Sequence, residues 1–326
     1  MRTDDGAELQ VLVEGPTDAT KATDPSGAPR PTVVLVHGYG LSGECWVEQL
    51  TALREGYRVV VPDLRGHGAS TRGPAGPITV RQLADDLGRV LDTVVPDGPV
   101  VLVGHSLGGM TVMELAARRP DLLPRVAGVG LIATSSGGLA GFDHGLPLLG
   151  RHLLRWAENA LERGREHLDV LERGRRAGAD LEQRLLRRWN FAGPVEPELV
   201  RAVARMMAAT PVDVIADLLP AFATLDLAAA LPALAGRPVL VLSAERDRMV
   251  PPGHGADVAG AIEGAEHVLL RASGHLVLLE RPDVVNARLL GLLARVGRGV
   301  VAGPPPEQVV VPLPRRRRTV RRGVRA

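Results

Sequence analysis

The sequence predicts an α/β fold, in which a mostly parallel central sheet is flanked by helices and a helical cap is inserted into the chain. Short, continuously apolar segments alternate with amphipathic ones over residues 1–134 and again over residues 235–298. This alternation is typical of parallel sheets whose strands are covered on both faces by helical crossovers. Residues 135–234 lack strand-like runs and show helical periodicity, which predicts the cap.

The composition is that of a chain that folds around its own core. It has 326 residues, 45% of them hydrophobic, which is enough to bury a sizeable core. Its one cysteine, Cys45, excludes an intrachain disulfide, and nothing indicates an oxidising compartment. The N-terminus has no apolar signal segment, and no run reaches the roughly 18 apolar residues that a membrane span needs. We therefore expect a cytoplasmic protein without a transmembrane segment.

The N-terminal part of the core, residues 1–134, alternates strands with helices. The predicted strands are residues 31–38, 57–68, 98–106 and 126–134. The helices predicted between them are residues 44–53, 80–95 and 107–120. Thr79 is placed to cap the second of these helices, because a threonine hydroxyl can accept an N–H of the first turn. Pro120 ends the third helix.

The predicted cap, residues 135–234, interrupts this rhythm. Its helices are predicted at residues 151–174, 179–191, 198–209 and 212–225. The second part of the core, residues 235–298, is predicted to hold strands at 237–244 and 266–273 and helices at 254–262 and 275–296. A helical insertion most simply covers the strand ends, the edge at which open parallel sheets bind ligands.

The C-terminal residues 299–326 are rich in proline and arginine, and we expect a disordered tail. The whole chain carries a net charge of +2, but seven arginines lie in its last twelve residues, so the remaining chain carries −5. Such a tail could bind nucleic acid or an anionic surface. It lacks the interleaved aromatic residues that stack on bases, and we favour a solvated tail without a dedicated partner.

A short motif, Gly104-His105-Ser106-Leu107-Gly108, follows a predicted strand and precedes a predicted helix. The pattern G-x-S-x-G in this context is typical of a nucleophile on a sharp turn, where neighbouring chain segments pack so closely that small residues are required. The turn would hold the Ser106 hydroxyl at the positive end of a helix, which stabilises developing negative charge. A phosphate-binding loop is disfavoured because no G-K-[ST] sequence follows.

A serine hydroxyl needs a base, and candidates follow in the expected order of nucleophile, acid and histidine. Asp247 comes just after the predicted strand 237–244, with Glu245 as a rival two residues earlier. His275 lies in the loop after the next strand, whereas its rival His267 lies within that strand. The residues alone leave the choice of acid open.

Five motifs occur together in order: HGYG, DLRGHGAS, GHSLGG, RDRMVP and SGHLVLLERP, spanning residues 37–282. With them the chain resembles the enzymes of the α/β-hydrolase-fold superfamily. The resemblance implies Ser106 as nucleophile, His275 as general base and Asp247 as the acid that orients it. It also implies an oxyanion hole formed by the backbone N–H groups of Tyr39 and Leu107, so that the side chain of Tyr39 matters little there.

The resemblance further implies the type of reaction. A serine at the elbow argues against the dehalogenases and epoxide hydrolases of the superfamily, which use aspartate. We expect a serine hydrolase without a cofactor that cleaves a carboxylic ester, or a related acyl compound, with an apolar moiety through an acyl-serine intermediate. The alternatives are a C–C-bond hydrolase or a cofactor-free perhydrolase on the same triad, and a non-catalytic relative that binds a small molecule.

Other residues are candidates for binding or structure. Asp63 is expected to brace its own loop. Trp46 could touch the oxyanion side of the pocket, although a tryptophan in a helix is more often part of the core. Large apolar side chains of the cap could line the substrate pocket or hold the cap helices together: Trp189, Phe191, Met206, Met207 and Phe222. Three histidines at strand ends lack the spacing of a zinc site, so we predict no metal and interpret them as hydrogen-bonded structural residues: His37, His67 and His105.

Overall fold

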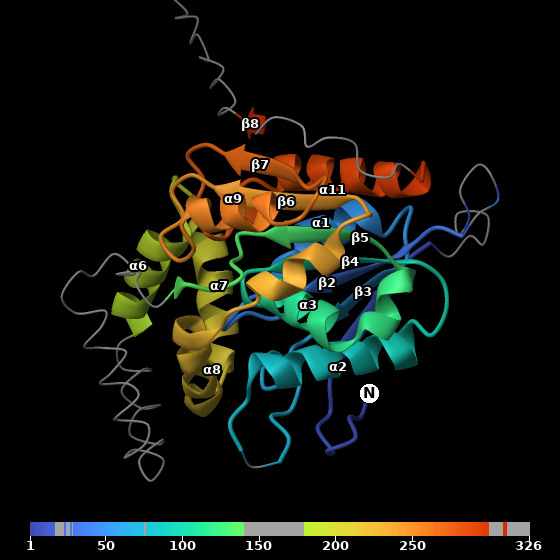
Figure 1. The fold of residues 1–326 in the computed structure, drawn as a ribbon. Helices are drawn as coiled ribbons and strands as arrows, with labels where there is room; N and C mark the ends of the chain where they lie inside the picture. The colour runs from blue at the N-terminus through green and yellow to red at the C-terminus, as the bar shows by residue number, and fades with distance from the viewer. Residues whose placement is uncertain are drawn as a thin grey trace, which may run out of the picture.

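The computed structural model describes residues 1–16, 23, 27, 29–74, 76–139, 179–299 and 309–311. Its centre is a twisted sheet of eight strands in the order β1-β3-β2-β4-β5-β6-β7-β8 (Figure 1). All neighbouring strands are parallel except β1, which runs antiparallel to β3. The strands are β1 (Val11–Glu14), β2 (Thr32–Val36), β3 (Val59–Pro62), β4 (Val100–His105), β5 (Val126–Ile132), β6 (Val239–Ala244), β7 (Glu266–Leu270) and β8 (Val309–Val311).

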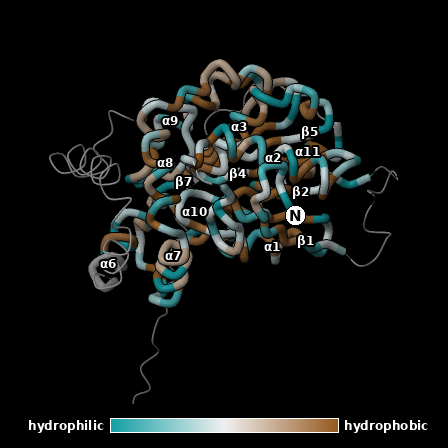
Figure 2. Tube along the Cα trace, turned by 90° about the horizontal axis from the view of Figure 1, so that it is seen from below, coloured by the Kyte–Doolittle hydropathy of each residue, from teal (hydrophilic) through white to brown (hydrophobic). Residues whose placement is uncertain are grey.

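Helices cover both faces of the sheet, α1 and α11 on one and α2, α3 and α9 on the other (Figure 1). Alternate residues of β2 show why: Val33 and Leu35 belong to one hydrophobic cluster, Val34 and Val36 to the other. The hydrophobic stretches run through the interior, and the outer turns are mostly hydrophilic (Figure 2). The core helices are α1 (Val47–Leu53), α2 (Val80–Val94), α3 (Leu107–Arg118), α9 (Pro252–Gly260), α10 (Val277–Glu280) and α11 (Pro282–Gly297).

The predicted α/β fold is confirmed, and most predicted elements lie where the sequence places them. Thr79 caps α2 by accepting the N–H of Gln82 at 3.2 Å. The single helix expected over 275–296 is wrong, because the chain breaks at Arg281 into α10 and α11. The residue before a proline is disfavoured in helical geometry, and Pro282 starts a new helix.

Both edges of the sheet differ from the prediction. β1 was not predicted; it is half-exposed and pairs with β3 at one edge. At the other edge Val309–Val311 pair with β7 as β8, so these three residues of the predicted tail are not disordered. The remaining tail residues beyond 299, and the helix expected at 151–174, lie outside the described residues.

The cap helices described are α6 (Ala179–Asn190), α7 (Pro197–Ala209) and α8 (Val212–Thr224), which lie together beyond the carboxyl ends of the strands (Figure 1). The insertion leaves and rejoins the core at one place, where the Leu227 N–H donates to the Ser136 carbonyl at 2.6 Å. The 3₁₀ helix Ala228–Leu234, inside the predicted cap boundary, instead packs in the core beside α3.

No single helix in the described ranges has the length and apolar content to cross a membrane; α7 and α8 meet that test only together, as a pair bent by 95°.

Candidate active site

Ser106 occupies a strained turn between β4 and α3. Its backbone has φ 52° and ψ −119°, in the region that residues other than glycine rarely adopt, and its N–H donates to the Ile132 carbonyl at 2.9 Å. A Cβ atom at Gly104 would lie 2.5 Å from the backbone of Gly108, and one at Gly108 would overlap the Val36 carbonyl oxygen. The glycines on either side of the serine are therefore required by close packing.

The structure brings His275 and Asp247 to this serine. His275 Nε2 lies 3.1 Å from Ser106 Oγ, and its Nδ1 lies 2.8 Å from Asp247 Oδ2. A carboxylate only accepts, so the hydrogen sits on Nδ1 and the Nε2 lone pair faces the serine hydroxyl. The Asp247 side chain has no exposed surface, and its other oxygen accepts the N–H groups of Met249 and Val250 at 2.8 Å. These bonds satisfy the buried charge and fix its direction.

The two rival residues lie elsewhere. Glu245 is exposed and accepts the Ala272 N–H at 2.8 Å, where it braces the turn after β7. His267 Nε2 bonds Ser243 Oγ at 2.9 Å inside the sheet region. Only Asp247 and His275 of the four candidates form a hydrogen-bonded chain that ends at Ser106.

The His275 loop is held by two neighbours that the sequence did not single out for this role. His105 Nε2 donates to the His275 carbonyl at 3.0 Å, and the two rings lie 4.9 Å apart. Burial lowers the pKa of His105 well below its usual range, so its ring stays neutral. Glu280 accepts the N–H of Gly274, next to His275, at 2.7 Å. The base is thus supported through its backbone on both sides.

The predicted oxyanion hole consists of two backbone N–H groups, those of Tyr39 and Leu107. Within the described residues, no acceptor takes the backbone N–H of Tyr39 or of Leu107. Leu107 begins α3, so its N–H belongs to the free first turn of a helix. The two donors therefore remain available to a negatively charged oxygen.

The side chain of Tyr39 has a role that the local sequence does not reveal. Its hydroxyl donates to the Ile215 carbonyl of α8 at 2.6 Å, and its ring packs edge-on against Phe222 at 5.2 Å. Burial raises the pKa of Tyr39, which keeps the donor protonated. Tyr39 thus joins the oxyanion loop to the cap across 176 positions of sequence.

The other strand-end histidines are neutral and bonded to the backbone. His37 accepts the Leu64 N–H at Nε2 and donates from Nδ1 to the Gly38 carbonyl; burial and the neighbouring His67 lower its pKa to about 3. His67 donates to the Arg65 carbonyl, and burial lowers its pKa as well. Among the described residues, no group of three or more histidine, cysteine or acidic side chains is arranged to hold a metal.

Asp63 braces its loop as expected. Its carboxylate accepts the N–H groups of Gly43 and Ala69 at 2.7 and 2.9 Å.

The apolar side chains predicted to line the pocket lie in different environments in the structure. Trp46 has no exposed surface and packs edge-on against His105, so it belongs to the core beneath the site. Phe191 and Met206 are also buried in that core cluster, and Trp189 is partly exposed. Met207 lies against Gly40, beside the oxyanion loop, where a Cβ atom on Gly40 would lie 3.1 Å from its Cε.

Comparison with known proteins identifies the family of the fold. The sequence model of the family described as alpha/beta hydrolase fold matches residues 31–282, which include Ser106, Asp247 and His275. Among solved structures, the enol-lactonase from Burkholderia xenovorans LB400 superposes with a TM-score of 0.68 at 27% identity, covering 88% of this chain and 97% of that one.

Two curated relatives are similar over most of their length. The chain is 29% identical to the magnesium-chelatase 30 kDa subunit of Rhodobacter capsulatus, over 83% of this chain and 89% of the relative. It is also 29% identical to the pimeloyl-acyl-carrier protein methyl ester esterase of Stenotrophomonas maltophilia, over 81% of this chain and 93% of the relative.

Proposed function

The chain belongs to the alpha/beta hydrolase fold family, and from this premise we propose that it is a serine hydrolase that cleaves a carboxylic ester through an acyl-serine intermediate. The observation that carries the proposal is the His275 ring, bonded to Asp247 at one nitrogen and 3.1 Å from Ser106 Oγ at the other. A base oriented in this way makes a serine hydroxyl nucleophilic.

In the proposed mechanism, Ser106 Oγ attacks the ester carbonyl while His275 Nε2 takes the hydroxyl proton. The negative charge that develops on the carbonyl oxygen is stabilised by the N–H groups of Tyr39 and Leu107 and by the positive end of α3. Asp247 stabilises the imidazolium. His275 then gives its proton to the leaving alcohol, and the acyl group stays on Ser106. A water deprotonated by His275 attacks the acyl carbon, the acid leaves, and His275 returns the proton to Ser106 Oγ.

The relatives support an ester as the substrate. Two of them carry names for ester cleavage, a lactonase and a methyl ester esterase. The apolar side chains of the cap, Met207 and Phe222 among them, favour a hydrophobic part on the substrate. The cytoplasmic location and the absence of a cofactor remain predictions.

One comparison favours a second candidate. The relative from Rhodobacter capsulatus is named as a subunit of a magnesium chelatase, a name that specifies no hydrolysis. A chain of this kind would bind a small molecule under the cap without turning it over, as fold and function are separable.

The deciding experiment is covalent labelling with a fluorophosphonate probe, followed by intact-mass spectrometry of the wild type and of Ser106→Ala. We expect one adduct on the wild type, none on Ser106→Ala, and slow labelling of His275→Ala. Hydrolysis of 4-nitrophenyl butyrate by the wild type alone would then identify the ester activity. A folded wild type that neither labels nor hydrolyses the ester would favour the binding protein instead.

A further inference from the structure

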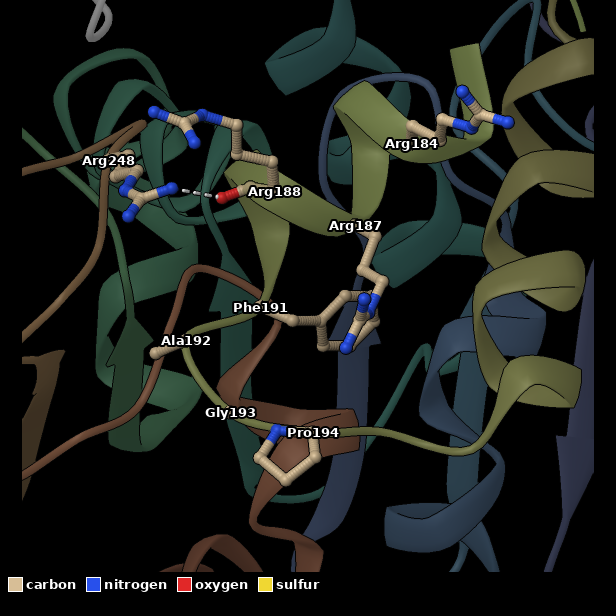
Figure 3. Close-up of a pocket in the computed structure, with 8 residues that line it drawn as sticks. All are labelled: Arg184, Arg187, Arg188, Phe191, Ala192, Gly193, Pro194 and Arg248. Atoms are coloured by element: carbon tan, nitrogen blue, oxygen red, sulfur yellow. Dashed lines mark hydrogen bonds between the residues drawn. The ribbon is translucent and has the colours of Figure 1, made fainter. Parts of the chain in front are cut away.

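A pocket of about 460 Å³ opens at the end of α6, beside the catalytic loops (Figure 3). Half of its lining residues are arginines and none is acidic: Arg184, Arg187, Arg188, Phe191, Ala192, Gly193, Pro194 and Arg248. Arg187 runs from α6 toward Phe191, and Arg188 and Arg248 lie together on the opposite flank (Figure 3). The pocket therefore combines an apolar base with a cationic rim.

The structure gives these arginines no ion-pair partner in the part of the chain that it describes. Within the described residues, none of the four guanidinium groups forms an ion pair with a carboxylate. Arg65, by contrast, lies between Asp5 and Asp86, at 2.7 Å from each. The rest of the chain before the arginine-rich C-terminus carries net negative charge. What distinguishes the four is that they are exposed and gathered around one pocket, where their guanidinium groups can donate to an oxyanion.

Stabilisation of a helix end does not account for the set. Arg187 and Arg188 lie in the last turn of α6, where a positive charge favours the helix dipole. Arg248 comes from a different element, the loop after β6, and its Nη1 donates to the Arg188 carbonyl at 2.6 Å. Arg248 and Arg188 are 60 positions apart in sequence, so only the tertiary fold brings them together.

The wall of the pocket is bonded to both catalytic loops. Arg248 follows Asp247 directly. On the other side, the Leu276 N–H donates to the Asn190 carbonyl at 3.0 Å. Glu280 accepts the Gly193 N–H at 2.7 Å with one oxygen and the Gly274 N–H at 2.7 Å with the other. A ligand held in the pocket therefore lies against the segment that packs on the base and its acid.

From this geometry we infer that the arginine pocket binds an oxyanion, a carboxylate or a phosphate, on a part of the substrate that is not attacked. That this ligand is the substrate rests on the proposed ester hydrolysis. The inference defines the substrate class as esters that carry a second, negatively charged group. Planar, multidentate guanidinium groups suit both oxyanions, and an apolar segment of the ligand would pack on Phe191 and Pro194.

Binding can be measured without turnover. Ser106→Ala protein is titrated with inorganic phosphate, with succinate and with the uncharged dimethyl succinate by calorimetry at constant ionic strength. We expect binding of the two anions, weakened by added NaCl because exposed charges are screened, and much weaker binding of the neutral ester. Tighter binding of phosphate would identify a phosphate-bearing substrate, and tighter binding of succinate a carboxylate. Equal or absent binding of all three would overturn the inference.

Kinetics provide the second test. The ratio of kcat/KM for the anionic mono-4-nitrophenyl glutarate to that for neutral 4-nitrophenyl butyrate is compared between variants. We expect Arg187→Gln/Arg248→Gln to lower this ratio about tenfold, since exposed charge pairs contribute modestly one by one. Arg201→Gln/Arg205→Gln removes the same charge from α7, outside the pocket, and leaves the ratio unchanged.

The two tests separate failure of this inference from failure of the proposed function. Hydrolysis of both esters with no anion binding and an unaltered ratio would refute the arginine pocket and leave the hydrolase standing. Saturable anion binding by Ser106→Ala that is lost in Arg187→Gln/Arg248→Gln, together with no ester turnover by the wild type, would establish the site and refute the hydrolase.

Discussion

The two sides of the candidate active site are held by different kinds of interaction. On the core side, the elbow at Ser106 is fixed by backbone contacts so close that Gly104 and Gly108 admit no side chain. On the cap side, side-chain bonds form the attachment, such as Tyr39 to α8 and Glu280 to the segment before α7. Arg72 adds ion pairs to Asp213 and Asp217 of α8.

This difference implies that the core side fixes the reacting atoms, whereas the cap side determines how the substrate is bound. Backbone sterics tolerate almost no change, and they position the reacting atoms to within a few tenths of an ångström. Individual hydrogen bonds and ion pairs contribute about 1 kcal/mol each and can be exchanged one at a time. Substitutions on the core side should therefore abolish activity or folding, whereas those on the cap side should shift substrate affinity.

Among substitutions that keep both Ser106 and His275, the largest effect is expected at the proposed acid; Ser106→Ala and His275→Ala should each cost more. Asp247→Asn should slow turnover about 10⁴-fold, because an amide cannot hold the His275 ring with its lone pair toward Ser106. Glu245→Gln serves as the control, since a glutamine can still accept the Ala272 N–H. Steady-state kinetics on 4-nitrophenyl butyrate measure both. A greater loss in Glu245→Gln than in Asp247→Asn would show that the acid is misassigned.

The next largest effect concerns the elbow backbone. Gly108→Ala should prevent folding or lower the free energy of unfolding by about 3 kcal/mol or more, because the new methyl group overlaps the Val36 carbonyl. Gly260→Ala, at the end of α9 with open space around its Cα, should change it by less than about 1 kcal/mol. Soluble yield and thermal melting report the difference; matching melting curves for the two variants would contradict the steric account.

Acid should weaken the core side through its buried histidines. His37, His67 and His105 have lowered pKa values in the folded protein, so the unfolded chain binds more protons below about pH 6.5. Stability is then lost as the pH falls from 6.5 toward the folded pKa, about 3 for His37. Between these two pH values His37 contributes roughly 1.4 kcal/mol per pH unit.

Urea unfolding at pH 7 and pH 5 checks this linkage. The free energy of unfolding should be smaller at pH 5, by about 2 kcal/mol through His37, and His67 and His105 should act in the same direction. An equal free energy at the two pH values would mean that these rings are not held neutral.

The smallest effect is expected on the cap side. Tyr39→Phe removes the bond to Ile215 but keeps the backbone N–H that we propose for the oxyanion hole. We expect KM to rise a few-fold, in line with about 1 kcal/mol for one hydrogen bond, while kcat changes little. Tyr57→Phe is the matched control, because this tyrosine lies just before β3 with its ring under Arg30. Loss of turnover by two orders of magnitude or more would place the hydroxyl in the chemistry itself.

The central strands, the helices between them and the positions of Ser106 and His275 at strand ends follow from the sequence without further information. These features are local: periodicity follows from which faces are buried, and G-x-S-x-G follows from the space available within one turn. The edge strands β1 and β8 escaped prediction because strands of four and three residues are too short to show a distinctive pattern.

The residues alone left Asp247 and Glu245 open, and only the family resemblance favoured Asp247. In the folded chain Asp247 bonds His275, whereas Glu245 bonds the Ala272 N–H. Folding also joined Tyr39 to Ile215 and placed Arg248 beside Arg188. Contacts between residues far apart in sequence produce no periodicity and no motif, because the local sequence around each residue does not depend on its distant partner. Their geometry exists only once the chain has packed.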